Sequence, residues 1–184
     1  MYIKEIYMKK ILCYCTIILL FTAGNVAANG SIQAFGSWWD SGDADTSYGG
    51  GLRGTIGKEI AIDIGWTYFT GDDITIDIGG KEETLDFGGL DSQVYDLGIR
   101  YTFPMEIYLG GGGSYYTFDS DVGSTDGKGG LYGLIGWSFG GELVRGFVEG
   151  IYRYTEATVE FDTADDYDIS YDGIGANIGI MYRF

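Results

Sequence analysis

The feature that most constrains this chain is a two-residue alternation of apolar with polar or small residues, which recurs from Ser31 to the last residue. The clearest case begins at Ile60: one face would carry Ile60, Ile62, Ile64, Trp66 and Tyr68, and the other Ala61, Asp63, Gly65, Thr67 and Phe69. A period of two is that of a β-strand whose two faces meet different surroundings. No stretch after Ser31 has a convincing helical period, so the chain is predicted to be all-β.

Eight segments of about ten residues have strand composition and frequent period-two alternation. They are residues 31–40, 48–57, 60–69, 93–103, 106–118, 130–140, 143–160 and 171–184. The alternation assigns the two faces clearly in 60–69, 93–103 and 171–184. It is blurred in 31–40 and 106–118, so the faces of these two segments stay unassigned.

The connections between these segments alternate in length. Three are tight and four are long: 57–59, 104–105 and 140–142 against 41–47, 70–92, 119–129 and 161–170. Short turns at one end and long loops at the other are typical of outer-membrane barrels, in which the turns face the periplasm. The prediction is therefore an eight-stranded antiparallel up-and-down transmembrane β-barrel with short periplasmic turns and long acidic extracellular loops.

Residues 1–28 have the three zones of a cleaved secretory signal: a basic start, an apolar run from Ile11 to Ala23, and small residues before a cut after Ala28. The apolar run is about 13 residues long, short of the roughly 20 that span a bilayer as a helix, so cleavage is expected rather than anchoring. Translation could begin at Met1 or at Met8. Residues 29–184 are then expected to form one outer-membrane β-barrel domain.

The composition excludes several classes of function. The formal net charge of −16 would repel nucleic acid. Both cysteines, Cys13 and Cys15, lie in the predicted signal, and the chain has no histidine. Barrel enzymes generally pair a histidine with a serine or an aspartate, and this chain cannot build such a site. No catalytic residue, cofactor site or metal site is therefore assigned.

Charged residues on the predicted inward faces form a mixed set of three acids and four bases. They are Arg53, Asp63, Asp96, Arg100, Glu149, Arg153 and Arg183. Side chains fill the interior of an eight-stranded barrel, so we expect these groups to form a buried ion-pair network that plugs the bore. The alternative is that they line a conducting pore. A basic residue on the lipid face near the midplane would cost roughly 2–4 kcal/mol, which favours the inward assignment.

Most of the 27 acidic residues fall in the four long loops or at the strand ends beside them. They are Asp40, Asp43, Asp45, Asp72, Asp73, Asp77, Glu82, Glu83, Asp86, Asp91, Asp119, Asp121, Asp126, Glu156, Glu160, Asp162, Asp165, Asp166, Asp168 and Asp172. A solvated, self-repelling surface would account for them. The alternative is the binding of divalent cations, which also bridge lipopolysaccharide, because clustered carboxylates suit calcium or magnesium. No loop has calcium-loop spacing, since Gly123 replaces the ligand expected after Asp119 and Asp121.

The final segment has Ile178, Ile180 and Tyr182 on one face and ends on Phe184. This pattern resembles the assembly signal of bacterial outer-membrane barrels. Residues 95–101 and 147–154 show the same kind of strand alternation. With these segments, the whole of 29–184 resembles the OmpA/OmpX-like small-barrel superfamily. The resemblance implies a place in the bacterial outer membrane and insertion by the outer-membrane assembly machinery. It is one of architecture, and it carries no functional residues over.

Within that superfamily we expect an integral outer-membrane protein with a structural or surface-interaction role, monomeric and in contact with outer-membrane lipid and lipopolysaccharide. A narrow porin-like channel for small solutes is the main alternative, and a barrel enzyme would need a site built without histidine. A soluble lipocalin-like binding barrel is a further alternative, because Gly36-Ser37-Trp38 is similar to the Gly-x-Trp of lipocalins. Lipocalins place their apolar residues inside and usually add a helix near the C-terminus, whereas this chain has strand patterning to its last residue.

Overall fold

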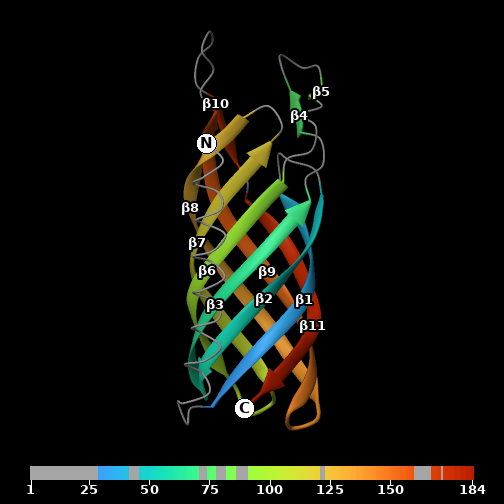
Figure 1. Ribbon diagram of the computed structural model, residues 1–184, viewed down its shortest axis with the longest axis vertical. Helices are drawn as coiled ribbons and strands as arrows, with labels where there is room; N and C mark the ends of the chain where they lie inside the picture. Colours follow the sequence, from blue (N-terminus) through green and yellow to red (C-terminus); the bar gives the residue numbers. More distant parts are fainter. Residues whose placement is uncertain are drawn as a thin grey trace, which may run out of the picture.

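The computed structural model describes residues 29–41, 46–70, 74–77, 82–85, 91–120, 123–159, 167–170 and 172–184. Eight long strands form its main body (Figure 1). They are β1 (Gly30–Ser41), β2 (Ser47–Gly57), β3 (Ile60–Thr70), β6 (Asp91–Thr102), β7 (Ile107–Ser120), β8 (Gly123–Gly140), β9 (Val144–Val159) and β11 (Gly173–Arg183). Within the described ranges, no helix is long and apolar enough to cross a membrane. The predicted signal, residues 1–28, lies outside the described residues, and its cleavage stays a prediction.

The eight strands close into a barrel by pairing in chain order. Each strand is antiparallel to the one before it in the barrel, and β11 returns to β1, with Ser31 opposite Arg183 and Ser41 opposite Gly173. Closure gives every barrel strand two hydrogen-bonded neighbours, so the barrel leaves no strand edge open to pair with another chain. The predicted all-β, eight-stranded antiparallel architecture is confirmed.

Side chains alternate between the barrel interior and its outer surface. In β3, Asp63 and Phe69 are 1% exposed, whereas Ile60 on the other face is 69% exposed. The faces that alternation assigned in β3, β6 and β11 are those observed. In β1 and β7, whose faces the sequence left open, the interior receives Gln33, Phe35, Tyr108 and Tyr116.

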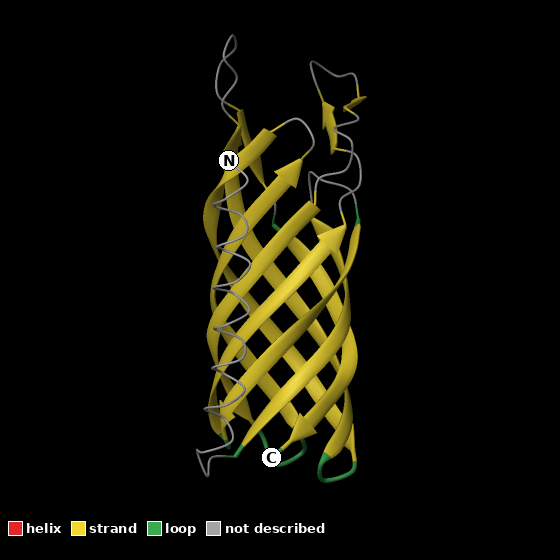
Figure 2. Ribbon diagram, viewed as in Figure 1, coloured by secondary structure: helices red, strands yellow, loops and turns green. Residues whose placement is uncertain are grey.

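The two ends of the barrel differ in how the strands are joined (Figure 2). At one end, which we call the turn end, short connections join β2 to β3, β6 to β7 and β8 to β9. These connections are residues 58–59, 103–106 and 141–143. Gly57 and Gly140 lead into two of them with φ of 132° and 116°, a conformation that glycine adopts without steric cost. The opposite end, the loop end, carries the other connections.

Paired strands extend into three of the segments predicted as long loops. The additional short strands are β4 (Ile74–Asp77), β5 (Glu82–Leu85) and β10 (Tyr167–Ser170). β4 pairs with β5, and β10 pairs with the end of β9. β7 and β8 also continue through most of the predicted loop 119–129. Antiparallel pairing needs only a neighbouring backbone, and each of the three additional strands has only four residues, which gives a search for alternation little to detect.

Glycines in β6 and β7 make room for large side chains that enter the barrel from β8. A Cβ on the inward Gly98 would lie 2.3 Å from the Tyr132 hydroxyl and 2.5 Å from the Gly111 carbonyl oxygen. A Cβ on Gly110 would lie 3.3 Å from the Leu134 side chain. Small residues therefore face large ones across this part of the interior, which lets the side chains pack closely in a narrow barrel.

We expect Gly98→Ala to lower the free energy of unfolding by about 1–3 kcal/mol, because the added methyl overpacks the interior against a backbone carbonyl that cannot move aside. Urea titration of the protein folded into lipid vesicles measures this difference. Gly133→Ala is the matched control, since a Cβ there meets nothing within 4 Å. Equal losses in the two variants would contradict the packing argument.

Candidate functional site

Four charged side chains from four strands meet in the middle of the barrel. We call them the central cluster: Arg53 of β2, Asp63 of β3, Arg100 of β6 and Glu149 of β9. Arg53 Nη1 lies 2.5 Å from Glu149 Oε1, and Arg100 Nε lies 2.8 Å from Asp63 Oδ2. Arg100 Nη2 also lies 3.4 Å from Glu149 Oε1, so the two pairs are joined. All four side chains are almost completely buried.

Neutral polar groups satisfy the carboxylates of the central cluster. The Tyr108 hydroxyl donates to Glu149 Oε1 at 2.9 Å, and Asn177 Nδ2 donates to Glu149 Oε2 at 3.0 Å. The Thr55 hydroxyl donates to Asp63 Oδ1 at 2.8 Å. Removing carboxylates from water is costly unless charge pairs and hydrogen bonds replace the lost hydration. This arrangement supplies both kinds of replacement.

A second ion pair lies closer to the loop end, formed by Asp96 of β6 and Arg153 of β9. Arg153 Nη1 donates to Asp96 Oδ1 at 2.8 Å, and Nη2 donates to Oδ2 at 2.9 Å, which is the two-pronged geometry that suits guanidinium and carboxylate. The Ser114 hydroxyl donates to Asp96 at 2.6 Å. This pair and the central cluster together balance three arginines against three carboxylates, so the interior network is neutral.

Aromatic rings close the interior beyond the second ion pair. Trp39, Phe69 and Tyr116 are all buried near the loop-end termini of their strands. The Trp39 ring centroid lies 5.4 Å from that of Phe69 and 6.1 Å from that of Tyr116, within the range of favourable aromatic pairs. Three successive layers therefore cross the bore: the central cluster, the Asp96–Arg153 pair and this aromatic layer.

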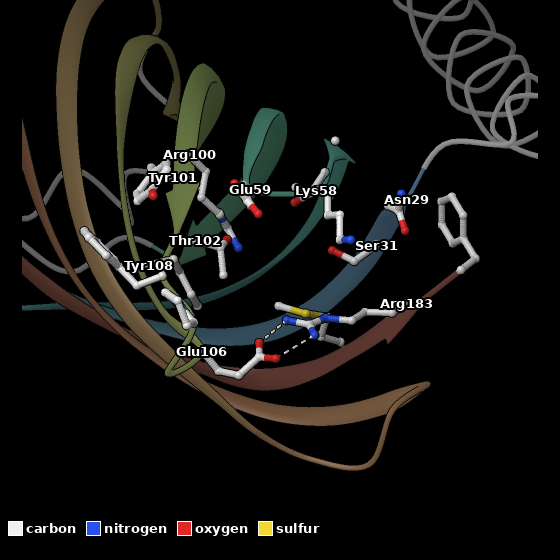
Figure 3. Close-up of a pocket in the computed structure, with 17 residues that line it drawn as sticks. Asn29, Ser31, Lys58, Glu59, Arg100, Tyr101, Thr102, Glu106, Tyr108 and Arg183 are labelled. Atoms are coloured by element: carbon white, nitrogen blue, oxygen red, sulfur yellow. Dashed lines mark hydrogen bonds and ion pairs between the residues drawn. The ribbon is translucent and has the colours of Figure 1, made fainter.

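Arg183 is separate from the other six residues of the predicted network, which corrects that part of the prediction. It lies at the turn end, where its side chain is 33% exposed and its guanidinium donates to both carboxylate oxygens of Glu106, at 3.2 and 2.5 Å (Figure 3). Arg183 does share the inward face of β11 with Asn177, as alternation predicts. Alternation gives a side chain's face but not its height, and Arg183 is the last residue of its strand.

Glu106 is held by groups from three strands. Besides Arg183 of β11, Arg145 of β9 places Nη2 3.8 Å from Glu106 Oε2, and the Ser138 hydroxyl of β8 donates to the same oxygen at 3.2 Å. The hydrogen bond from Arg183 is the main reason that the pKa of the Glu106 carboxyl lies below its usual value, and the charges of Arg183 and Arg145 add to it. We call Glu106, Arg145 and Arg183 the mouth cluster.

A cavity of about 460 Å³ opens at the turn end beside the mouth cluster. Its lining includes Arg183 and Glu106, together with Lys58 and with Ser31, which pairs with Arg183 across the β1–β11 seam (Figure 3). Arg100 belongs to its lining, and so does Tyr108, the tyrosine that donates to Glu149. The cavity thus reaches inward from the turn end as far as the central cluster.

Sequence reasoning placed six network residues in the interior but missed others that complete the site. Arg145 shares the inward parity of Glu149 and Arg153, so alternation could have identified it. Glu106 lies in a turn next to the single proline, where no periodic signal exists. The neutral partners Tyr108, Ser114 and Asn177 were also missed as site residues, because a search for charge does not detect them.

The acidic loop residues that the structure describes form no defined metal site. Among the described residues, no group of three or more aspartate or glutamate side chains is placed to hold a metal ion. Asp40, Asp91 and Asp172 are the predicted loop acids whose side chains the structure describes. The other predicted loop acids lie outside the described side chains, so cation binding by them stays a prediction.

The predicted assembly-signal residues lie on the outer surface of the barrel. Ile178, Ile180 and Tyr182 project outward from β11 and are 67%, 63% and 50% exposed, and Phe184 follows them at the turn end. β11 also forms the seam of the barrel with β1. These residues are therefore accessible to a partner from outside the barrel.

Comparison with known proteins identifies the architecture. No protein-family model matches the chain, and no curated protein matches it. A major outer membrane protein from Thermus thermophilus is 16% identical in sequence, with a TM-score of 0.62. The structural match covers 86% of this chain and 100% of that one. Neisserial surface protein A is 14% identical (TM-score 0.57, covering 85% and 97%), and the N-terminal β-barrel domain of Pseudomonas aeruginosa OprF is 13% identical (TM-score 0.52, covering 85% and 97%). At these identities the likeness shows the fold alone: the chain has the fold of the small eight-stranded outer-membrane β-barrels.

Proposed function

We propose that this protein is an integral, monomeric component of the bacterial outer membrane whose sealed barrel serves a structural or surface-interaction role. The observation that carries the proposal is the set of three buried layers that cross the bore. A protein built to conduct would keep a continuous polar passage, whereas here each arginine of the interior network is engaged by a carboxylate. If the barrel does not conduct, the segments at the loop end are the part of the protein available for contacts with other molecules.

The outer surface supports placement in a bilayer. Large apolar residues project outward around the barrel, among them Ile62, Leu97, Ile99, Leu131, Ile135 and Ile178. Such a belt would be an aggregation hazard in water, and it is the surface that lipid tails require. Aromatic pairs Tyr101–Phe103 and Trp137–Phe139, with ring centroids 4.8 and 5.0 Å apart, lie on this surface near the turn end. Aromatic residues at this height suit the membrane interface.

The short connections support an orientation with the turn end in the periplasm, as in outer-membrane barrels generally. β1 starts and β11 finishes at that end (Figure 1). The loop end would then face outward among lipopolysaccharide, with divalent cations as candidate partners of its acidic residues. The exposed face of Ile178, Ile180 and Tyr182 would be the surface that the outer-membrane assembly machinery contacts.

Of the three structures named above, one is described as an outer membrane protein and one as a surface protein, and none of the three descriptions names a catalytic activity. We therefore extend the proposal to a protein without catalysis. One observation favours a second candidate, a narrow porin-like channel: the turn-end cavity already penetrates to Arg100. Passage would then require the Arg53–Glu149 pair to separate.

Conductance of the purified protein in a planar bilayer tests the sealed-interior proposal. We expect no stable, discrete openings, because the buried layers leave no continuous path for hydrated ions. Insertion is verified on the same sample by a heat-modifiable band in gel electrophoresis. Reproducible single-channel steps from the folded protein would overturn the proposal and establish the channel.

A further inference from the structure

The turn-end cavity is the one part of the described surface where basic groups gather. Lys58 and Arg183 line it, and Arg145 lies behind Arg183 in the mouth cluster. Glu59 and Glu106 also line the cavity, and Glu106 is paired with Arg183 and Arg145. The whole chain has a formal charge of −16, so this gathering of basic groups is contrary to the overall balance.

Glu106 occupies this mouth in an unusual backbone conformation. Its φ is 61°, and it is the one non-glycine residue with positive φ in the described part of the chain. Glutamate rarely adopts this region, and residues held there are commonly found where surrounding contacts or function require it. Here the contacts are those of the carboxylate with Arg183, Arg145 and Ser138. The Glu106 N–H also donates to the Phe103 carbonyl and the Glu106 carbonyl accepts from the Ser138 N–H, so backbone and side-chain contacts together hold this conformation.

We propose that the turn-end cavity binds a small anion carrying a phosphate or carboxylate group, and that Glu106 is a resident carboxylate which the incoming anion displaces from Arg183. Guanidinium forks bind both phosphate and carboxylate through paired hydrogen bonds, so one anion can take the place of the other.

The cavity suits such a ligand in size and in lining. Its volume of about 460 Å³ falls in the range of small-molecule sites, roughly 300–1,000 Å³. Lys58 and Ser31 also line the cavity and provide further hydrogen-bond donors, Ser31 from the position in β1 that pairs with Arg183 (Figure 3). Arg100 and Tyr108 line its inner part, where their bonds to the central cluster keep them in place. This inference does not depend on whether the barrel conducts.

Two methionines provide built-in reporters for the test. The buried Met181 lines the cavity, whereas Met105 lies in the exposed turn outside it. Protein labelled with ¹³C at the methionine methyls, folded in zwitterionic detergent, is titrated with inorganic phosphate at constant ionic strength. A second titration uses a short-chain phosphatidylglycerol, which carries the same group on a lipid. We expect a saturable shift of the Met181 methyl and none of the Met105 methyl.

Variants assign the shift to the proposed groups. Glu106→Gln removes the competing charge and is expected to tighten anion binding at least threefold, whereas Arg183→Ala and Lys58→Ala each weaken it at least threefold. Glu142→Gln, an exposed acid in another turn at the same end, is the matched control and leaves the affinity unchanged. Lys58→Ala keeps the test intact if Arg183→Ala does not fold, because Lys58 takes no part in the mouth cluster.

The outcomes separate clearly. Saturation by inorganic phosphate supports a site for soluble anions, and saturation by phosphatidylglycerol alone supports the same site with a lipid headgroup as its source. Absence of a saturable Met181 shift in both the unmodified protein and Glu106→Gln would overturn the proposal. So would equal affinities in the unmodified protein, Arg183→Ala and Lys58→Ala, because the shift would then reflect general charge screening.

Discussion

Glu149→Ala is expected to lower the free energy of unfolding by about 3–5 kcal/mol, the usual consequence of removing one partner from a buried ion pair. The variant would leave Arg53 buried without a carboxylate and would remove the acceptor for Tyr108 and Asn177. Arg100 would keep its bond to Asp63. The loss should therefore come mainly from the uncompensated charge of Arg53. Urea titration in lipid vesicles measures it.

Two further variants distinguish charge from volume. Glu149→Gln keeps the side-chain size. We expect its free energy of unfolding to fall nearly as much as that of Glu149→Ala, because the amide cannot neutralise Arg53. The double variant Arg53→Met with Glu149→Met removes both charges and should be more stable than Glu149→Ala, as replacement of a whole buried pair by apolar residues often is. Glu142→Ala in the exposed turn is the control for losing a glutamate. A double variant less stable than Glu149→Ala would show that the charges themselves stabilise the barrel.

Leu97→Arg is expected to lower the free energy of unfolding from a bilayer by roughly 2–4 kcal/mol, the cost of a basic residue on the lipid face near the midplane. Leu97 is central in β6 and projects outward, 62% exposed, between the inward Asp96 and Gly98. Arg100, on the inward face of the same strand, is tolerated because the interior offers it the carboxylates of Asp63 and Glu149. Unfolding in urea from vesicles, together with the loss of the heat-modifiable band, reports the effect.

Met105→Arg is the matched control for Leu97→Arg, because Met105 is 76% exposed in the 103–106 turn, outside the proposed hydrocarbon region. We expect its effect to be close to zero. Leu97→Phe keeps the surface apolar and should also be nearly neutral. If Leu97→Arg cost no more than Met105→Arg, the outward face of β6 would not be in contact with lipid, and the proposed membrane placement would fail.

The faces of the strands could be predicted because alternation is a local property. Asp63, Asp96, Glu149 and the arginines at positions 53, 100 and 153 were assigned to the interior from their parity alone, and the structure places all six there. The parity rule needs apolar residues on one face as a reference. In β1 and β7 this reference was missing, because Phe35 and Tyr116 point inward while small residues such as Gly36 point outward.

Which interior residues meet could not be predicted, because that depends on the height of each residue in the barrel. Strand tilt and register set this height, and both follow from pairing around the whole barrel. Arg183 illustrates the limit: parity gave its face correctly, but its position at the end of β11 places it with Glu106 rather than with Glu149. The position of Glu106 beside Arg183 could not be predicted either, because it depends on the backbone conformation of the 103–106 turn.

The sequence by itself therefore determined the strand number, the antiparallel order and the inward faces of the clearly alternating strands, because these follow from local composition and a period of two. The tertiary structure alone decided that the charges divide into a neutral buried network and a separate mouth cluster. That division arises from closure of the barrel, which brings together residues as distant in the chain as Arg53 and Glu149 or Glu106 and Arg183.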